Sequence, residues 1–155
     1  MKFIYPCETP IGKLKIAEVD GQISHILFDG AENLPGYEER KTELIEKAEF
    51  QLKEYFRGRL RVFDLPLLLQ GTEFQKGVWR ALMEIPYGET RSYKDVAAIV
   101  KAPKAVRAVG MSNNRNRLPI IIPCHRVIGS NGKLVGYAGG LDVKQWLLDM
   151  EKAEN

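Results

Sequence analysis

The sequence predicts an α/β (α+β) protein in which a small sheet comes first and a mostly helical part follows. Apolar and polar residues alternate through the first 30 residues, which is the period of a half-buried strand. From residue 72 onward the apolar residues recur every three or four positions, which is the period of an amphipathic helix. Acidic side chains outnumber basic ones by 12 to 10 in residues 1–70, whereas basic ones lead by 13 to eight in residues 71–155. The two parts therefore differ in both structure and charge.

The N-terminal part is predicted to be a small antiparallel meander covered by one helix. Strands are expected over residues 2–5, 14–19 and 23–28, because turn-forming residues separate three short alternating runs. The period then changes, and residues 38–57 carry apolar side chains at helical spacing among Glu and Lys. Residues 61–71 are expected to form a strand or a linker.

The C-terminal part begins with a helix predicted over residues 72–85. Thr72 and Gln75 have the spacing of a capping box, in which the hydroxyl and the amide satisfy free N–H groups of the first turn. Two shorter helices are expected over residues 92–100 and 103–111, the second with a proline in its first turn, where proline is tolerated. Two short helices joined by a turn of a few residues suggest a helix-turn-helix motif.

Regular periodicity fades between residues 113 and 140, which are rich in Asn, Gly and Pro. The apolar run at residues 118–122 predicts one buried, strand-like segment in this loop, and loops on a rigid scaffold often carry site residues. A last helix is expected over residues 141–152. Its apolar face is expected to consist of Val143, Trp146, Leu147 and Met150.

Composition limits the classes of protein to consider. A chain of 155 residues with 45% hydrophobic and 28% charged residues fits a globular protein, which excludes a disordered tail or a collagen-like repeat. No apolar run approaches the roughly 20 residues that span a bilayer, and two cysteines cannot form a multi-bridge framework. We therefore expect an intracellular protein with reduced thiols and no membrane partner, cytoplasmic or, in a eukaryote, nuclear.

Basic side chains are concentrated in residues 91–133. This segment contains nine of them and a single acid, Asp95, although the net charge of the whole chain is only +3. A basic cluster around a predicted helix-turn-helix favours a nucleic acid partner, because Lys and Arg neutralise phosphates. The nine are Arg91, Lys94, Lys101, Lys104, Arg107, Arg115, Arg117, Arg126 and Lys133.

Cys124 and His125 form the pair of residues with the clearest chemistry. A thiol attacks as the thiolate, and a free cysteine with a pKa of about 8.5 needs a base or a positive field to ionise at neutral pH. His125 and Arg126 follow Cys124 directly. The preceding Pro123 has a fixed φ and no N–H to donate, so it favours a turn at this point over a continuing core strand. The alternative is a buried structural cysteine beside a hydrogen-bonded histidine.

Glu151 is the candidate for the third group that fixes the tautomer of a histidine base. At about 100° per residue it lies about 40° from Leu147, so its carboxylate borders the apolar face of the last helix and could reach His125. A solvated glutamate in the last turn is an equally good interpretation.

Metal binding is not expected, because the two cysteines and two histidines lack metal-ligand spacing, and no cofactor is implied.

Longer motifs surround this pair of residues. Residues 120–128 read Ile-Ile-Ile-Pro-Cys-His-Arg-Val-Ile, and residues 136–148 read Gly-Tyr-Ala-Gly-Gly-Leu-Asp-Val-Lys-Gln-Trp-Leu-Leu. These segments resemble the active-site region of the O6-alkylguanine-DNA alkyltransferases (methylated-DNA–protein-cysteine methyltransferases). The resemblance extends to Arg91-Ser92-Tyr93, Asn113-Asn114-Arg115-Asn116 and residues 105–110. The resemblance is dense over residues 72–151 and covers residues 1–70 only in general layout.

This resemblance implies a ribonuclease-H-like N-terminal domain at residues 1–70 and a helical, winged-helix-type DNA-binding domain at residues 71–155. It implies a monomer that binds double-stranded DNA through the minor groove and flips O6-alkylguanine out of the duplex. The alkyl group then passes irreversibly to the protein, one turnover per molecule. O4-alkylthymine is a further candidate substrate.

The resemblance also assigns roles to individual residues. Cys124 would be the alkyl acceptor, His125 its base acting through a water, Glu151 the group that orients His125, and Asn116 the residue that holds the active-site segment. Donors near O6 lower the barrier, because the leaving guanine must be protonated as the C–O bond breaks.

A second set of residues would contact DNA or the flipped base. Tyr93 would crowd the 3′ phosphate, Arg107 would fill the vacated stack, and Tyr137 would donate toward the purine. Ala138 stands where many members have a serine, which removes a hydroxyl near O6. The remaining predicted DNA contacts are Ser92, Arg115 and Arg126.

Three alternatives belong to other classes of protein. An alkyltransferase-like lesion-binding protein would sense damage without transfer, but such proteins lack the acceptor cysteine that Cys124 supplies. A Cys-His hydrolase would turn over many times on an ester or amide. A helix-turn-helix transcription regulator would show a base-sequence preference.

Overall fold

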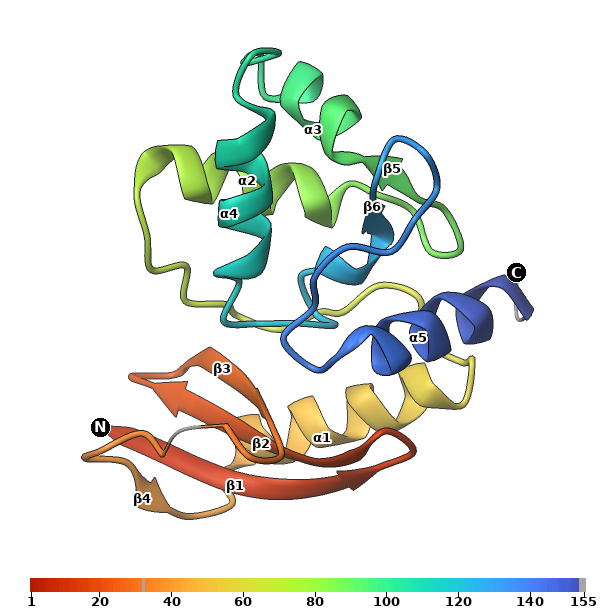
Figure 1. The fold of residues 1–155 in the computed structure, drawn as a ribbon. Helices are drawn as coiled ribbons and strands as arrows, with labels where there is room; N and C mark the ends of the chain where they lie inside the picture. Colours follow the sequence, from red (N-terminus) through yellow and green to blue (C-terminus); the bar gives the residue numbers. More distant parts are fainter. Residues whose placement is uncertain (32, 154–155) are drawn as a thin grey trace. The chain divides into compact units, whose positions relative to one another are not determined.

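The computed structural model describes residues 1–31 and 33–153 of the chain (Figure 1). They form two compact units, Met1–Leu69 (unit 1) and Gln70–Asn155 (unit 2). Unit 1 is a small sheet with one long helix, and unit 2 is mostly helical (Figure 1). The predicted α+β class is confirmed.

Unit 1 is built on a four-stranded sheet in the order β3-β2-β1-β4. The predicted antiparallel meander is present, with β1 at Lys2–Thr9, β2 at Gly12–Val19 and β3 at Gln22–Phe28. Tight turns join these strands, and Gly21 adopts a φ of 81° that an L side chain rarely tolerates. Of residues 61–71, Leu67 makes an isolated parallel bridge and the rest form no strand or helix.

The helix of unit 1 begins later than predicted. Helix α1 spans Glu43–Phe56, whereas the prediction began at residue 38. Glu38–Glu39 instead form β4, which pairs in parallel with β1. Thr42 sets the boundary, because its hydroxyl accepts a hydrogen bond from the Ile45 amide as the N-cap. The charged residues before Thr42 gave no apolar period from which the start could be placed.

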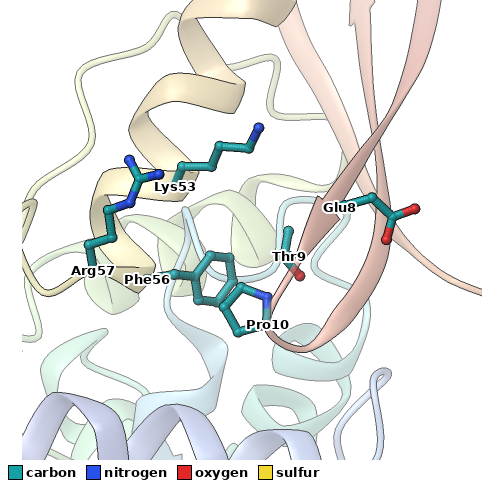
Figure 2. A pocket seen from close by; sticks show the side chains of 6 residues that line it. All are labelled: Glu8, Thr9, Pro10, Lys53, Phe56 and Arg57. Carbon is teal, nitrogen blue, oxygen red and sulfur yellow. The ribbon is translucent and has the colours of Figure 1, made fainter.

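A pocket of about 300 Å³ opens in unit 1 between the turn that joins β1 to β2 and the end of α1 (Figure 2). Figure 2 shows the side chains of Lys53 and Arg57 extending from the helix. The lining contains no cysteine or histidine, so it offers no pair of a thiol and a base. The lining residues are Glu8, Thr9, Pro10, Lys53, Phe56 and Arg57.

Unit 2 contains four α-helices and a two-stranded parallel sheet among its described residues. The predicted capping box is confirmed, since the Thr72 hydroxyl accepts from the Gln75 amide and the Gln75 side chain accepts from the Thr72 amide. Ser92 and Asp95 form a second capping box at the next helix. The elements are α2 (Glu73–Met83), β5 (Arg91–Ser92), α3 (Tyr93–Ile99), α4 (Val106–Asn114), β6 (Val127–Ile128) and α5 (Leu141–Ala153).

Helices α3 and α4 pack against each other as the predicted helix-turn-helix pair. Helix α4 begins at Val106, however, and the prediction that Pro103 lies in its first turn is wrong. Pro103 belongs to a turn that precedes the helix, and Ala105 stands at the N-cap without a side-chain hydrogen bond. Without a capping side chain the sequence carries no local signal for this helix start.

The apolar run at residues 118–122 is buried as predicted, but it is a turn and not a strand. The Ile122 amide donates to the Leu118 carbonyl at 2.8 Å, and Ile120 has a φ of 75°. A β-branched residue in this region costs about 1–3 kcal/mol, so the surrounding structure must hold it there. Apolar character predicted the burial but could not distinguish a buried turn from a buried strand.

Candidate active site

Cys124 lies at the start of a single 3₁₀ turn, Cys124–Arg126, directly after the strained apolar turn. The side chain of Asn116 braces this segment, because its Nδ2 donates to the Ile122 carbonyl at 2.8 Å and its Oδ1 accepts from the Leu118 amide at 2.9 Å. The Cys124 side chain is only 5% exposed. The thiol therefore has a fixed position inside unit 2.

The His125 ring lies beside the Glu151 carboxylate. His125 Nε2 is 2.7 Å from Glu151 Oε2, and both residues are fully buried. Arg126 holds the same carboxylate with two bonds, Nε to Oε1 at 2.9 Å and Nη2 to Oε2 at 3.0 Å, and the Gly88 amide donates to Oε1 at 3.2 Å. The carboxylate is thus oriented from three sides.

These partners set the ionisation of the Glu151–His125 pair. Hydrogen bonds and charge from His125 and Arg126 overcome the effect of burial and lower the pKa of Glu151 to about 2. The carboxylate can therefore only accept, so His125 Nε2 carries the proton and Nδ1 keeps the lone pair. Burial lowers the pKa of His125 despite the opposing effect of Glu151, which leaves the ring neutral near pH 7 and able to act as a base.

The Cys124 thiol is protonated at rest. Burial raises its pKa from 9.0 to about 11, while the hydrogen bond with Asn116 and the charge of Lys144 act in the opposite direction. A thiol with this pKa reacts only if a base removes its proton during the reaction. The neutral His125 next in the chain is suited to that task.

The buried face of α5 differs from the predicted one. Lys144, Leu147 and Glu151 are fully buried, whereas Trp146 is 39% exposed. Residues at positions i, i+3 and i+7 share one face of a helix, so the pattern is present in the sequence. Apolar periodicity did not select this face, because two of its three members are charged.

Lys144 is a site residue that the sequence interpretation missed. Its ammonium group donates to the Val135 carbonyl at 3.1 Å and to the Gly136 carbonyl at 3.3 Å. Burial lowers the pKa of Lys144, and the neighbouring Cys124 opposes that change. Lys144 thus fixes the loop before Tyr137 and brings a positive charge toward the thiol.

Replacing Lys144 with methionine should raise the pKa of Cys124 further, because the change removes a nearby positive charge while keeping an apolar stem of similar length. We expect alkylation of Cys124 near pH 7 to slow by about tenfold, the effect of one pKa unit. The pH profile of the rate is the measurement, and Lys152→Met, an exposed lysine on the same helix, is the matched control. A pH profile identical to that of the unaltered chain would contradict this role.

Two tyrosines reach the site from other elements. Burial raises the pKa of Tyr137 well above its ordinary value, so its hydroxyl stays protonated and can donate. The Tyr93 hydroxyl donates to the Val135 carbonyl at 3.0 Å, the same carbonyl that Lys144 binds. Ala138 is exposed beside Tyr137 and supplies no hydroxyl.

The predicted DNA contacts divide into surface and internal residues. Arg107 and Arg115 are exposed, and Ser92 uses its hydroxyl to accept the Asp95 amide at the start of α3. Arg126 differs from the prediction, because it is only 5% exposed. All three of its guanidinium nitrogens bond inside unit 2, two to Glu151 and Nη1 to the Ile85 carbonyl at 2.8 Å. Arg126 is therefore an internal counter-ion and not a phosphate contact.

Within residues 1–31 and 33–153, no three His, Cys, Asp or Glu side chains are grouped so that they could hold a metal ion. None of the helices in the same residues is long and apolar enough to cross a membrane.

Sequence models of two domains match the chain one after the other. Residues 4–69 match "6-O-methylguanine DNA methyltransferase, ribonuclease-like domain", and residues 73–153 match "6-O-methylguanine DNA methyltransferase, DNA binding domain". The chain belongs to this family. The resemblance inferred from the motifs around Cys124 is confirmed, and so is the predicted order of a ribonuclease-like domain before a DNA-binding domain.

Relatives in the family align with the chain over nearly its whole length. The methylated-DNA–protein-cysteine methyltransferase of Methanosarcina barkeri is 49% identical over 148 residues, which cover 94% of each chain. The constitutive methylated-DNA–protein-cysteine methyltransferase of Bacillus subtilis is 48% identical over 159 residues, covering 98% of this chain and 96% of its own. The crystal structure of Mycobacterium tuberculosis OGT in complex with DNA has a TM-score of 0.93 and 42% identity, covering 98% of this chain and 94% of that one.

Proposed function

We propose that this chain repairs DNA by direct reversal. It takes an alkyl group from O6 of guanine in duplex DNA onto Sγ of Cys124, and each molecule reacts once. The observation that carries the proposal is the buried thiol of Cys124 next to His125, whose Nε2 lies 2.7 Å from the Glu151 carboxylate, in a chain of this family.

The proposed reaction is a single displacement. His125 Nδ1 takes the thiol proton, through a water, and Sγ attacks the alkyl carbon as the C–O6 bond breaks. The guanine leaves with its O6 stabilised by the Tyr137 hydroxyl, and the proton passes in the end to the guanine. A thioether at Cys124 has no easily displaced group, so the protein is not regenerated.

The proposed mode of DNA binding uses the helix-turn-helix pair. Helix α4 enters the minor groove of duplex DNA, where Arg107 takes the place of the flipped nucleotide in the stack. Tyr93 lies against the 3′ phosphate, and Arg115 is one of the exposed basic side chains that bind phosphates without reading sequence. The chain acts as a monomer, because a single copy of unit 2 contains all of the proposed catalytic residues.

Intact-mass spectrometry tests the proposed function directly. After mixing with an excess of duplex that contains O6-methylguanine, the protein should gain about 14 Da once, since a methyl group replaces the thiol proton. Unmethylated duplex is the control and should leave the mass unchanged. Either the absence of a gain or release of more than one equivalent of repaired guanine per protein would contradict the proposal.

A further inference from the structure

The exposed face of α4 carries an apolar side chain that the proposed reaction does not use. Met111 is 57% exposed, the most of any large apolar side chain in the described part of unit 2. At about 100° per residue, Arg107, Met111 and Asn114 lie within about 60° of one another on the helix surface. Met111 therefore shares one stripe with the residue proposed to fill the vacated stack.

The C-terminal end of this stripe adjoins the loop that carries Tyr137. The Asn114 Oδ1 atom lies 3.3 Å from the position that a Cβ on Gly136 would occupy. Met111 lies about 6 Å along the helix axis from Arg107 and about 4.5 Å from Asn114, given a rise of about 1.5 Å per residue. Its side chain thus stands between Arg107 and the edge of the active-site loop.

The surroundings of Met111 identify what covers it. Single exposed apolar side chains are common on protein surfaces, so exposure alone decides nothing. The exposed charged groups near the two ends of α4 are cations, Lys101 and Lys104 before the helix and Arg115 after it, and no acidic residue lies between positions 96 and 141. This charge is complementary to a polyanion, and the helix is the one proposed to enter the minor groove.

We propose that Met111 is a second wedge in the minor groove. Its side chain packs against the sugar and base edges of the pair beside the flipped nucleotide, and it keeps that pair from closing the gap while Arg107 fills the stack. Minor-groove proteins use methionine and other apolar side chains in this way, and a flexible thioether adapts to any sequence. The inference rests on the proposed function, because it assumes that α4 binds duplex DNA and that the base is flipped.

The test compares transfer to Cys124 from a fully paired duplex with transfer from the free O6-alkylguanine base, which needs no flipping. Met111→Ala should slow the reaction with duplex by about 5- to 10-fold, since it removes most of the apolar contact, and should leave the reaction with the free base unchanged. Met111→Leu, which keeps the apolar bulk, should react with duplex at close to the original rate. Met83→Ala removes a methionine of α2 that is 38% exposed and should react normally with both substrates.

Three outcomes would count against Met111 as a wedge. If Met111→Ala reacts with duplex as fast as the unaltered protein does, the inference about Met111 is wrong, while the proposed function is unaffected. An equal loss on duplex and free base would show damage to the pocket and would also overturn it. An unaltered protein that gains no mass from either substrate would overturn the proposed function and the inference together.

Discussion

Replacing Cys124 with serine should abolish alkyl transfer and leave DNA binding largely intact. The hydroxyl has almost the same shape as the thiol, but it is a far weaker nucleophile and His125 cannot ionise it to a useful extent. Arg107 and Arg115 lie at the surface, apart from the buried thiol, so their contacts with phosphates should persist. Intact mass after mixing with O6-methylguanine duplex should stay constant, while fluorescence anisotropy with labelled duplex should give a Kd close to that of the unaltered chain.

The second cysteine provides a matched control for this prediction. Cys7 in β1 is 2% exposed, and its pKa is also raised to about 11, by burial and then by the Glu49 carboxylate. Burial therefore does not distinguish the two thiols. Lysine charges favour ionisation of both thiols, but the Glu49 carboxylate opposes it only at Cys7, and Cys124 alone has a neutral histidine next to it in the chain. Cys7→Ser should keep full transfer, and a mass gain by Cys124→Ser would show that the acceptor was assigned wrongly.

The sequence predicted those parts of the fold and site that depend on local signals. Capping residues placed the start of α2, and alternating residues placed the three strands of the meander, because these patterns act within a few residues. The Cys124–His125 pair was visible because the two residues are adjacent. Helical geometry placed Glu151 at the border of the buried face but left a solvated glutamate equally good, and the resemblance to the family supplied its role beside His125.

The sequence did not predict features that depend on contacts between distant segments. The sequence predicts Arg126 as a DNA contact because it lies in the basic cluster, but a guanidinium also binds carboxylates, and its partner Glu151 is 25 residues away. A lysine on a helix is usually solvated, so the sequence does not single out Lys144, and only the folded loop supplies the two carbonyls that it binds. The turn at Ile120 has no sequence signal, because its backbone strain is held by Asn116 and the surrounding core.

Replacing Glu151 with glutamine should destabilise unit 2 and slow alkyl transfer together. The substitution leaves the Arg126 guanidinium buried without its counter-ion, which costs about 3–5 kcal/mol of unfolding free energy. It also replaces one acceptor oxygen by an NH2 group that donates, so the His125 tautomer is no longer fixed and we expect a loss of about 100-fold or more in transfer rate. Both tryptophans, Trp79 and Trp146, belong to unit 2, so tryptophan fluorescence during denaturation by urea reports on this unit. Asp149→Asn, an exposed carboxylate on the same helix, should change stability by less than about 0.5 kcal/mol.

The pH dependence of the Glu151→Gln effect separates the ion pair from general damage to the core. The pKa of Glu151 is about 2 in the folded chain and near 4.5 when unperturbed, so its stabilising effect is complete above about pH 5 and is lost as the pH falls toward 2. The difference in stability between the unaltered chain and Glu151→Gln should therefore shrink on acidification, and a constant difference would exclude the ionised carboxylate as its cause. Adding Arg126→Met should recover part of the stability near pH 7, since no stranded charge remains, but none of the transfer rate, since His125 still lacks the carboxylate that fixes its tautomer.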